Sequence, residues 1–169
     1  MSHIAVIIDD MFEDSEYTQP AEAFKSEGHE LTHIGLEAGK TVKGKKDETP
    51  VQIDKAIKDV VANDFDALLI PGGFSPDKLR AHDEAVAFAK SFMETGKPVF
   101  SICHGAQLLI TADVLRGRKA TGWKSIAQDI KNAGAEFLDQ EVVDDGNLVS
   151  SRNPDDIPAF VKVSLSKLK

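Results

Sequence analysis

The chain has 169 residues, a length that suits one domain with a full hydrophobic core and is short for two. Its residues are 41% hydrophobic and 28% charged, an ordinary balance for a globular protein. The formal net charge of −8 argues against nucleic acid as a partner, because phosphate binding requires a basic surface. No apolar run approaches membrane-spanning length, so no membrane partner is expected.

Cys103 is the single cysteine of the chain. One cysteine excludes an internal disulfide bond and suits a reducing compartment. Residues 1–8 lead directly into an apolar run and lack the basic region and cleavage site of a signal peptide. We therefore expect a cytoplasmic protein.

Apolar runs alternate with amphipathic stretches along the chain, which predicts strands alternating with helices. Strands are predicted at residues 4–8, 29–34, 65–70, 99–102, 136–138 and 142–149. Helices are predicted at residues 16–27, 54–62, 83–95, 123–133 and 154–168, and a small projecting hairpin is predicted within residues 41–53. This order favours a single α/β domain over residues 1–169, a three-layer sandwich with a mostly parallel sheet.

Ligands in such folds bind at the C-terminal ends of the parallel strands. Three loops are expected to meet there: the acidic loop 9–16, the loop 72–77, and the stretch around Cys103. In that stretch a short buried strand is followed at once by a helix, which predicts a sharp turn that presents Cys103 at the edge of the sheet.

This turn would place Cys103 at a helix N-terminus, where free N–H groups favour an anion. We therefore predict a lowered pKa and a reactive thiolate. The alternative is a buried cysteine that only fills space, as many single cysteines do. His104 follows directly, so the two side chains are expected to point apart, although the imidazole could still act as an acid or base.

Backbone N–H groups are the candidates for stabilising an oxyanion. Gly72 and Gly73 follow the strand at 65–70, and paired glycines there let N–H groups face inward. An ordinary tight turn is an equally good interpretation of the pair. The N–H groups of Gly73 and His104 would together form the oxyanion site.

Two carboxylates of the acidic loop could reach the sulfur, Glu13 and Glu16. A protonated carboxyl can donate a hydrogen bond to a thiolate and lower the cysteine pKa. The alternative is a solvated acidic helix start. With one cysteine and no H-x-H spacing, no metal site and no cofactor are expected.

Three segments together resemble the PfpI-type intracellular protease/amidase family, which belongs to the class I glutamine amidotransferase-like superfamily. They are Phe12-Glu-Asp-x-Glu16, Leu69-Ile-Pro-Gly-Gly73 and Ser101-Ile-Cys-His-Gly105. Later segments, such as Val114-Leu-Arg-Gly-Arg118, match as well, so the resemblance covers nearly the whole chain. It implies a flavodoxin-like α/β/α sandwich with a nucleophile elbow, and a homo-oligomer, either a dimer or a ring of dimers.

The resemblance also implies roles for individual residues. Cys103 matches the nucleophile, His104 its partner, and Glu16 the glutamate that hydrogen-bonds the thiol. Asp77 falls where some members supply a glutamate from a neighbouring subunit to orient the histidine, although aspartate is one methylene shorter. Residues expected to bind substrate are Glu13, Gly72, Gly73, Lys45 and Trp123.

The function that this resemblance implies is a cysteine-dependent hydrolase, a peptidase or amidase, with a general stress-protective role. The residues alone do not separate it from a cofactor-independent glyoxalase or deglycase, so the substrate is a small carbonyl compound or a peptide. A non-enzymatic alternative is a redox sensor or holdase chaperone that uses Cys103.

Overall fold

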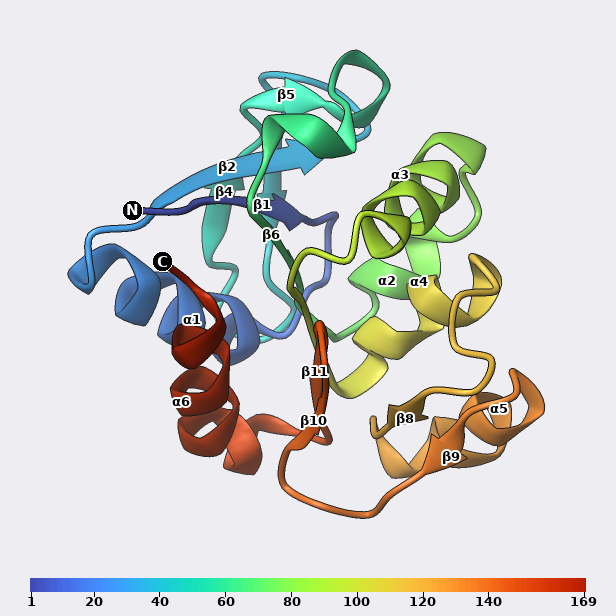
Figure 1. The fold of residues 1–169 in the computed structure, drawn as a ribbon. Coiled ribbons are helices and arrows are strands. Elements are labelled where there is room, and N and C mark those ends of the chain that lie inside the picture. Colours follow the sequence, from blue (N-terminus) through green and yellow to red (C-terminus); the bar gives the residue numbers. More distant parts are fainter.

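A seven-stranded sheet forms the centre of the computed structural model, which describes residues 1–169 (Figure 1). All neighbouring strands are parallel except the last pair, β10 and β11. The long apolar runs of the sequence supply the inner strands, which are buried on both faces. The strand order is β10 (Val143–Asp145), β11 (Leu148–Ser151), β7 (Val99–Ile102), β6 (Ala67–Ile70), β1 (His3–Ile7), β2 (Glu30–Gly35) and β5 (Lys55–Ala56).

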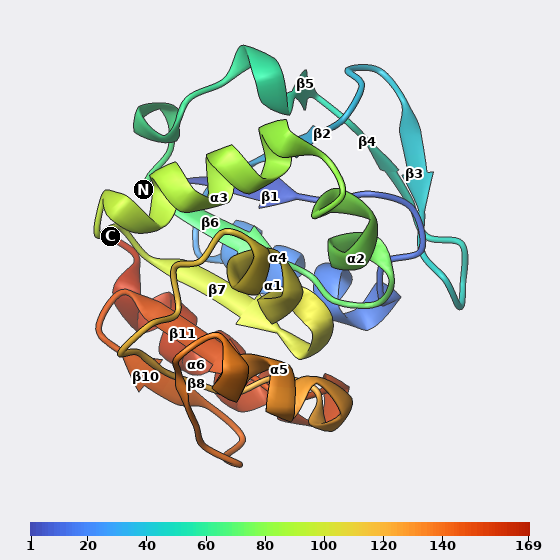
Figure 2. The same cartoon turned by 90° about the vertical axis from the view of Figure 1, so that its right-hand side faces the viewer.

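Helices cover both faces of this sheet, as Figures 1 and 2 show from two directions. One face carries α1 (Asp14–Ser26) and α6 (Ile157–Lys167). The other face carries α2 (Ser75–Leu79), α3 (Asp83–Glu94) and α4 (Ala106–Thr111), with α5 (Ala127–Asn132) beside them. None of these helices has both the length and the apolar character needed to cross a membrane.

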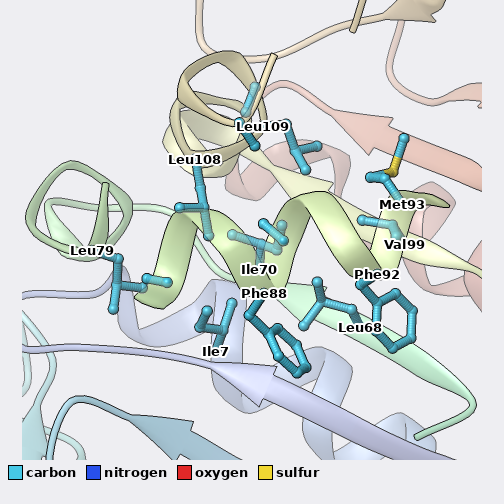
Figure 3. Close-up of a cluster of buried hydrophobic side chains, with 14 of the residues drawn as sticks. Ile7, Leu68, Ile70, Leu79, Phe88, Phe92, Met93, Val99, Leu108 and Leu109 are labelled. Atoms are coloured by element: carbon cyan, nitrogen blue, oxygen red, sulfur yellow. The ribbon is translucent and has the colours of Figure 1, made fainter. Parts of the chain in front are cut away.

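Each helical layer packs its own hydrophobic cluster against the sheet. Figure 3 shows the larger cluster, in which Phe88 and Phe92 of α3 lie over Leu68 of β6. Leu108 of α4 extends the same cluster towards the end of the sheet that holds the elbow. Burying one such side chain fully stabilises the fold by about 1.5–3 kcal/mol. This packing fixes where α4 begins and therefore where Cys103 lies.

Two small two-stranded sheets lie outside the central one. The predicted hairpin is confirmed: β3 (Thr41–Lys43) pairs antiparallel with β4 (Pro50–Gln52). The second small sheet pairs β8 (Lys119–Ala120) with β9 (Glu136–Phe137) in parallel. The hairpin projects beside the β1–α1 loop, as Figure 2 shows.

The predicted α/β sandwich with a mostly parallel sheet is confirmed, but the predicted helix at residues 54–62 is wrong. Residues Lys55–Ala56 form the edge strand β5, and two short 3₁₀ turns follow. The β-branched pair Val60 and Val61 favours extended backbone, and both residues adopt it. The chain also forms α2 within the loop 72–77 region, where no helix was predicted.

Candidate active site

A nucleophile elbow joins β7 to α4. The chain leaves β7 at Ile102, makes a single 3₁₀ turn over Cys103–Gly105 and enters α4 at Ala106. Cys103 has a φ of +61°, a left-handed conformation that costs a non-glycine residue on the order of 1–3 kcal/mol. The N–H of Trp123 donates to the Cys103 carbonyl at 3.1 Å and helps to hold this conformation. The strain indicates that the position of this side chain matters for function.

His104 lies against the sulfur. Its Nδ1 is 3.4 Å from Cys103 Sγ, so the expectation that the two side chains point apart is wrong. The left-handed turn at Cys103 brings the two side chains together, and its sign cannot be read from residue types. Burial, followed by the charge of Lys45, lowers the pKa of His104, so the imidazole is neutral at pH 7 and can accept a proton.

Glu16 lies beneath the elbow in the first turn of α1 and is completely buried. Its Oε1 accepts a hydrogen bond from the N–H of Gly72 at 3.0 Å. A Cβ at Gly72 would lie 2.4 Å from that oxygen and 2.9 Å from Cys103 Cβ, so only glycine allows this approach. Burial, reinforced by the charge of Glu13, raises the pKa of Glu16 to about 8. The carboxyl is therefore mostly protonated at neutral pH.

The Cys103 thiol and the Glu16 carboxyl form a coupled pair. Glu16 Oε2 has no well-formed hydrogen-bond partner, yet the carboxyl lies close enough to the thiol for each to shift the other's pKa. Burial, followed by the charge of Glu16, raises the pKa of Cys103 to about 12. The sequence predicted a lowered pKa, and the structure corrects this because Cys103 is only 8% exposed. Two negative charges here would repel, so the pair loses its first proton only near pH 8 and keeps the second up to about pH 12.

Two backbone N–H groups face the sulfur. Hydrogen bonding by the N–H groups of His104 and Gly73 acts to lower the pKa of Cys103, against the larger effect of burial. Gly73 is held in place by an antiparallel bridge to Phe12 of the β1–α1 loop. The two donors proposed from the sequence as an oxyanion site thus meet at the thiol, where a tetrahedral oxyanion would form.

Glu13 and Lys45 form the adjoining wall of the site. The Glu13 side chain is only 6% exposed, and it forms salt bridges of 3.0 Å with both Lys45 and Lys46. Lys45 Nζ also lies 5.4 Å from the centroid of the Phe74 ring. The hairpin loop between β3 and β4 therefore places two ammonium groups beside the elbow.

Asp77 and Trp123 lie at the outer edge of the site around Cys103 and His104, which we call the rim of the site. Asp77 is engaged within its own chain by Arg80, with contacts of 2.7 and 2.9 Å, and its side chain is 56% exposed. Its charge acts to raise the pKa of His104, but no hydrogen bond joins the two residues. The Trp123 ring lies with its centroid 6.3 Å from that of His104. No hydrogen bond or salt bridge joins Asp77 to any other residue predicted for the site.

Sequence reasoning missed two residues that shape the site. Asp14, read only as part of an acidic loop, is buried and organises the hairpin loop. Arg80, which occupies Asp77, was not considered. The i,i+3 spacing of Asp77 and Arg80 near a helix could have indicated the contact between them. No local signal indicates the role of Asp14, because Asp14 and its hydrogen-bond partners lie more than 30 residues apart in the sequence.

A sizeable cavity lies away from the elbow. It has a volume of about 500 Å³ and is lined by α3 and the 3₁₀ turns after β5, including Val61 and Phe88. It contains no cysteine or histidine, so its chemistry points to no reaction. No group of three or more His, Cys, Asp and Glu side chains is arranged to hold a metal ion. The elbow therefore remains the candidate site on chemical grounds.

Fold and site together define an α/β protein with a cysteine at its nucleophile elbow, a buried carboxyl beneath the sulfur and two N–H donors facing it. Residues 2–167 match the model of the DJ-1/PfpI family. The chain belongs to this family, which confirms the resemblance found in its sequence.

Curated relatives cover almost the whole chain. General stress protein 18 of Bacillus subtilis is 61% identical over 98% of this chain and 97% of its own length. Protein/nucleic acid deglycase 2 of Escherichia coli is 60% identical, over 98% and 96%. A second Bacillus subtilis relative, named "Putative cysteine protease YraA", is 57% identical over 98% of both chains. Two of these names, deglycase and cysteine protease, state different activities for similar chains.

A solved structure has the same fold. It is a two-domain protein from Anabaena variabilis, described as containing DJ-1/ThiJ/PfpI-like and ferritin-like domains. It is 40% identical, with a TM-score of 0.97, and the match covers 99% of this chain and 48% of that one. This chain therefore corresponds to about half of the Anabaena protein.

Proposed function

We propose that this protein is a cytoplasmic, stress-protective enzyme in which Cys103 attacks the carbonyl carbon of a small carbonyl compound or its adduct with an amine. The observation that carries the proposal is the environment of the sulfur. Glu16 shares a proton with it, the N–H groups of Gly73 and His104 face it, and His104 Nδ1 lies 3.4 Å away. A nucleophile, a proton acceptor and an oxyanion site are thus assembled in one place.

The first step would use the shared proton. When Glu16 holds that proton, the sulfur carries the negative charge and the carboxyl can donate to it. The sulfur forms a bond to the carbonyl carbon, the carbonyl electron pair moves to oxygen, and the two N–H groups stabilise the resulting charge.

The second step depends on the substrate. From an amide, neutral His104 passes a proton from the solvent to the leaving amine, and the C–N bond breaks to yield a thioester. From a 2-oxoaldehyde, His104 moves the proton of the attacked carbon to the neighbouring carbon, so that one carbon is oxidised to the thioester as the other is reduced to an alcohol. In both cases water then breaks the C–S bond, which releases a carboxylic acid and restores the thiol.

Small carbonyl substrates fit this site better than peptides do. Cys103 is only 8% exposed, which leaves little access for a chain. A peptidase mechanism would also need a carboxylate that orients His104, and within one chain no carboxylate is hydrogen-bonded to that imidazole. The relative named Protein/nucleic acid deglycase 2 supports the same choice.

The test compares the wild type with Cys103→Ala on three substrates. These are methylglyoxal, a peptide pre-treated with methylglyoxal, and an unmodified fluorogenic peptide amide. We expect turnover of the first two, little turnover of the third, and no turnover of any by the variant. Hydrolysis of the peptide amide alone would favour the peptidase. Protection of a heat-aggregating protein that survives in Cys103→Ala, without any turnover, would favour a holdase.

The proposal extends to a homo-oligomer, a dimer or a ring of dimers. Asp77 lies on the exposed rim of the site, and a two-fold axis there would bring the rim of one copy to the rim of another. In such a dimer, Asp77 of one chain would approach His104 of its partner. The exposed Phe74 and Met11, at 56% and 41%, supply apolar surface beside it.

A further inference from the structure

The loop between β3 and β4 is organised by one buried carboxylate, that of Asp14. The residue is 4% exposed. Its Oδ1 accepts a hydrogen bond from the N–H of Lys46 at 2.9 Å, and its Oδ2 accepts from the N–H groups of Asp47 and Thr49 at 3.3 and 3.1 Å. These hydrogen bonds outweigh the effect of burial and lower the pKa of Asp14 to about 2, so the carboxylate is charged at all ordinary pH values.

The loop fits closely around this carboxylate. A Cβ at Gly44 would lie 2.0 Å from Asp14 Oδ2, so a side chain there would push the loop away. The N–H of Lys45 donates to the Phe12 carbonyl at 2.9 Å, which ties the loop to the segment that also holds Gly73. The backbone on both sides of the Lys45 side chain is therefore fixed.

Two ammonium groups of the loop face a single buried carboxylate beside the elbow. Lys45 and Lys46 share one carboxylate, Glu13, so the three groups carry a net charge of +1. The charge of Lys45 acts on both His104 and Glu16, which places its ammonium within electrostatic reach of the reacting centre. Contact with the face of Phe74 holds Lys45 towards that centre. A cation is thus placed near His104 and Glu16 in a chain whose net charge is −8.

We propose that Lys45 is a specificity-determining residue that binds an anionic group of the substrate, and that Asp14 is the positioning residue that places it. This inference rests on the proposed attack of Cys103 on a carbonyl carbon. It narrows the substrates to carbonyl compounds or adducts that carry a carboxylate or another anion. An ammonium group with three donors can bind such an anion while it keeps its contact with Glu13.

The test uses two alkylating agents of similar size, iodoacetate and iodoacetamide. With both, the sulfur forms a bond to the same carbon and iodide leaves, but only iodoacetate is anionic. The ratio of the two rate constants on Cys103 therefore reports the preference for an anion, because the thiolate fraction cancels. We expect Lys45→Met to lower this ratio by about three- to tenfold. Lys43→Met, which removes an exposed lysine of the same hairpin, is expected to leave the ratio unchanged.

Asp14→Asn tests the positioning role. We expect the ratio to fall as in Lys45→Met, and the double variant to show no further decrease, because both changes remove the same interaction. An unchanged ratio in Lys45→Met, or an equal decrease in Lys43→Met, would overturn the role of Lys45. A normal ratio in Asp14→Asn would overturn the role of Asp14. Because alkylation requires no turnover, these outcomes are independent of the Cys103→Ala experiment that tests the proposed function.

Discussion

The buried carboxyl of Glu16 is expected to make the folded protein less stable as the pH rises. Its ordinary pKa of 4.5 applies to the unfolded chain, and burial with Glu13 raises the pKa in the folded protein to about 8. At pH values between 4.5 and about 8, the folded protein therefore holds a proton on Glu16 that the unfolded chain has already lost. The stability is complete below pH 4.5 and decreases as the pH rises towards 8.

The magnitude follows from the two pKa values. Each pH unit in that interval costs about 1.4 kcal/mol for one proton. The charge of Glu16 should thus reduce the free energy of unfolding by about 3 kcal/mol at pH 7 and about 5 kcal/mol above pH 8. Glu16→Gln keeps an acceptor for the N–H of Gly72 but does not titrate, so it should lose none of this stability.

The assay is chemical denaturation of the wild type and Glu16→Gln at pH 4.5, 7 and 8.5. Other titrating groups, including Asp14 and His104, are common to both proteins and cancel in the difference. We predict similar stability at pH 4.5 and an advantage for Glu16→Gln that grows with pH, with unchanged dependence on denaturant. Parallel pH profiles for the two proteins would refute the raised pKa of Glu16.

Three further outcomes are expected. Gly72→Ala should lower the free energy of unfolding by about 1–3 kcal/mol and slow alkylation of Cys103, because the added Cβ would press on the Glu16 carboxyl. Chemical denaturation and alkylation at pH 8 measure these two effects, and wild-type values for both would contradict the close approach of Gly72 to Glu16. His33 accepts a hydrogen bond from Tyr17 and pairs with Asp54, and burial lowers its pKa. The wild type should therefore lose stability as the pH falls below 6.5, and His33→Gln should lose less. Chemical denaturation of both proteins at pH 7.5 and 5.5 tests this. Mixing inactive Cys103→Ala with inactive Asp77→Ala under subunit exchange should restore activity if Asp77 acts across a dimer, whereas full activity of Asp77→Ala alone would exclude that role.

The sheet and the elbow were predictable because their signals are local. The buried run of β1 and the strand followed by Cys103 and a helix are visible within about ten residues each. The hairpin β3–β4 was predictable for the same reason. The edge strand β5 was not predictable, because only two residue pairs join it to β2 and the sequence around it has an amphipathic pattern that favours a helix.

The chemistry of the site was predictable only in part. The residue types that gather at the sulfur followed from the motifs, but the direction of the Cys103 pKa did not, because it depends on burial that no residue type reveals. The contact between Cys103 and His104 depends on the sign of one φ angle. The role of Asp14 depends on backbone N–H groups from a distant loop, which have no signature in the sequence.

The most direct test of the active site is the pH dependence of Cys103 alkylation by iodoacetamide in the wild type and in Glu16→Leu. The pair loses its first proton with a pKa of about 8, and if the two groups share the proton that remains, part of the negative charge lies on the sulfur. Alkylation of the wild type should then show a first rise with a midpoint near 8, before the full thiolate forms at about 12. Glu16→Leu removes the donor and leaves the burial, so its midpoint should be higher. A wild-type profile whose only rise lies near 12, or alkylation of Glu16→Leu at lower pH than the wild type, would show that Glu16 only repels the thiolate and would contradict the shared proton.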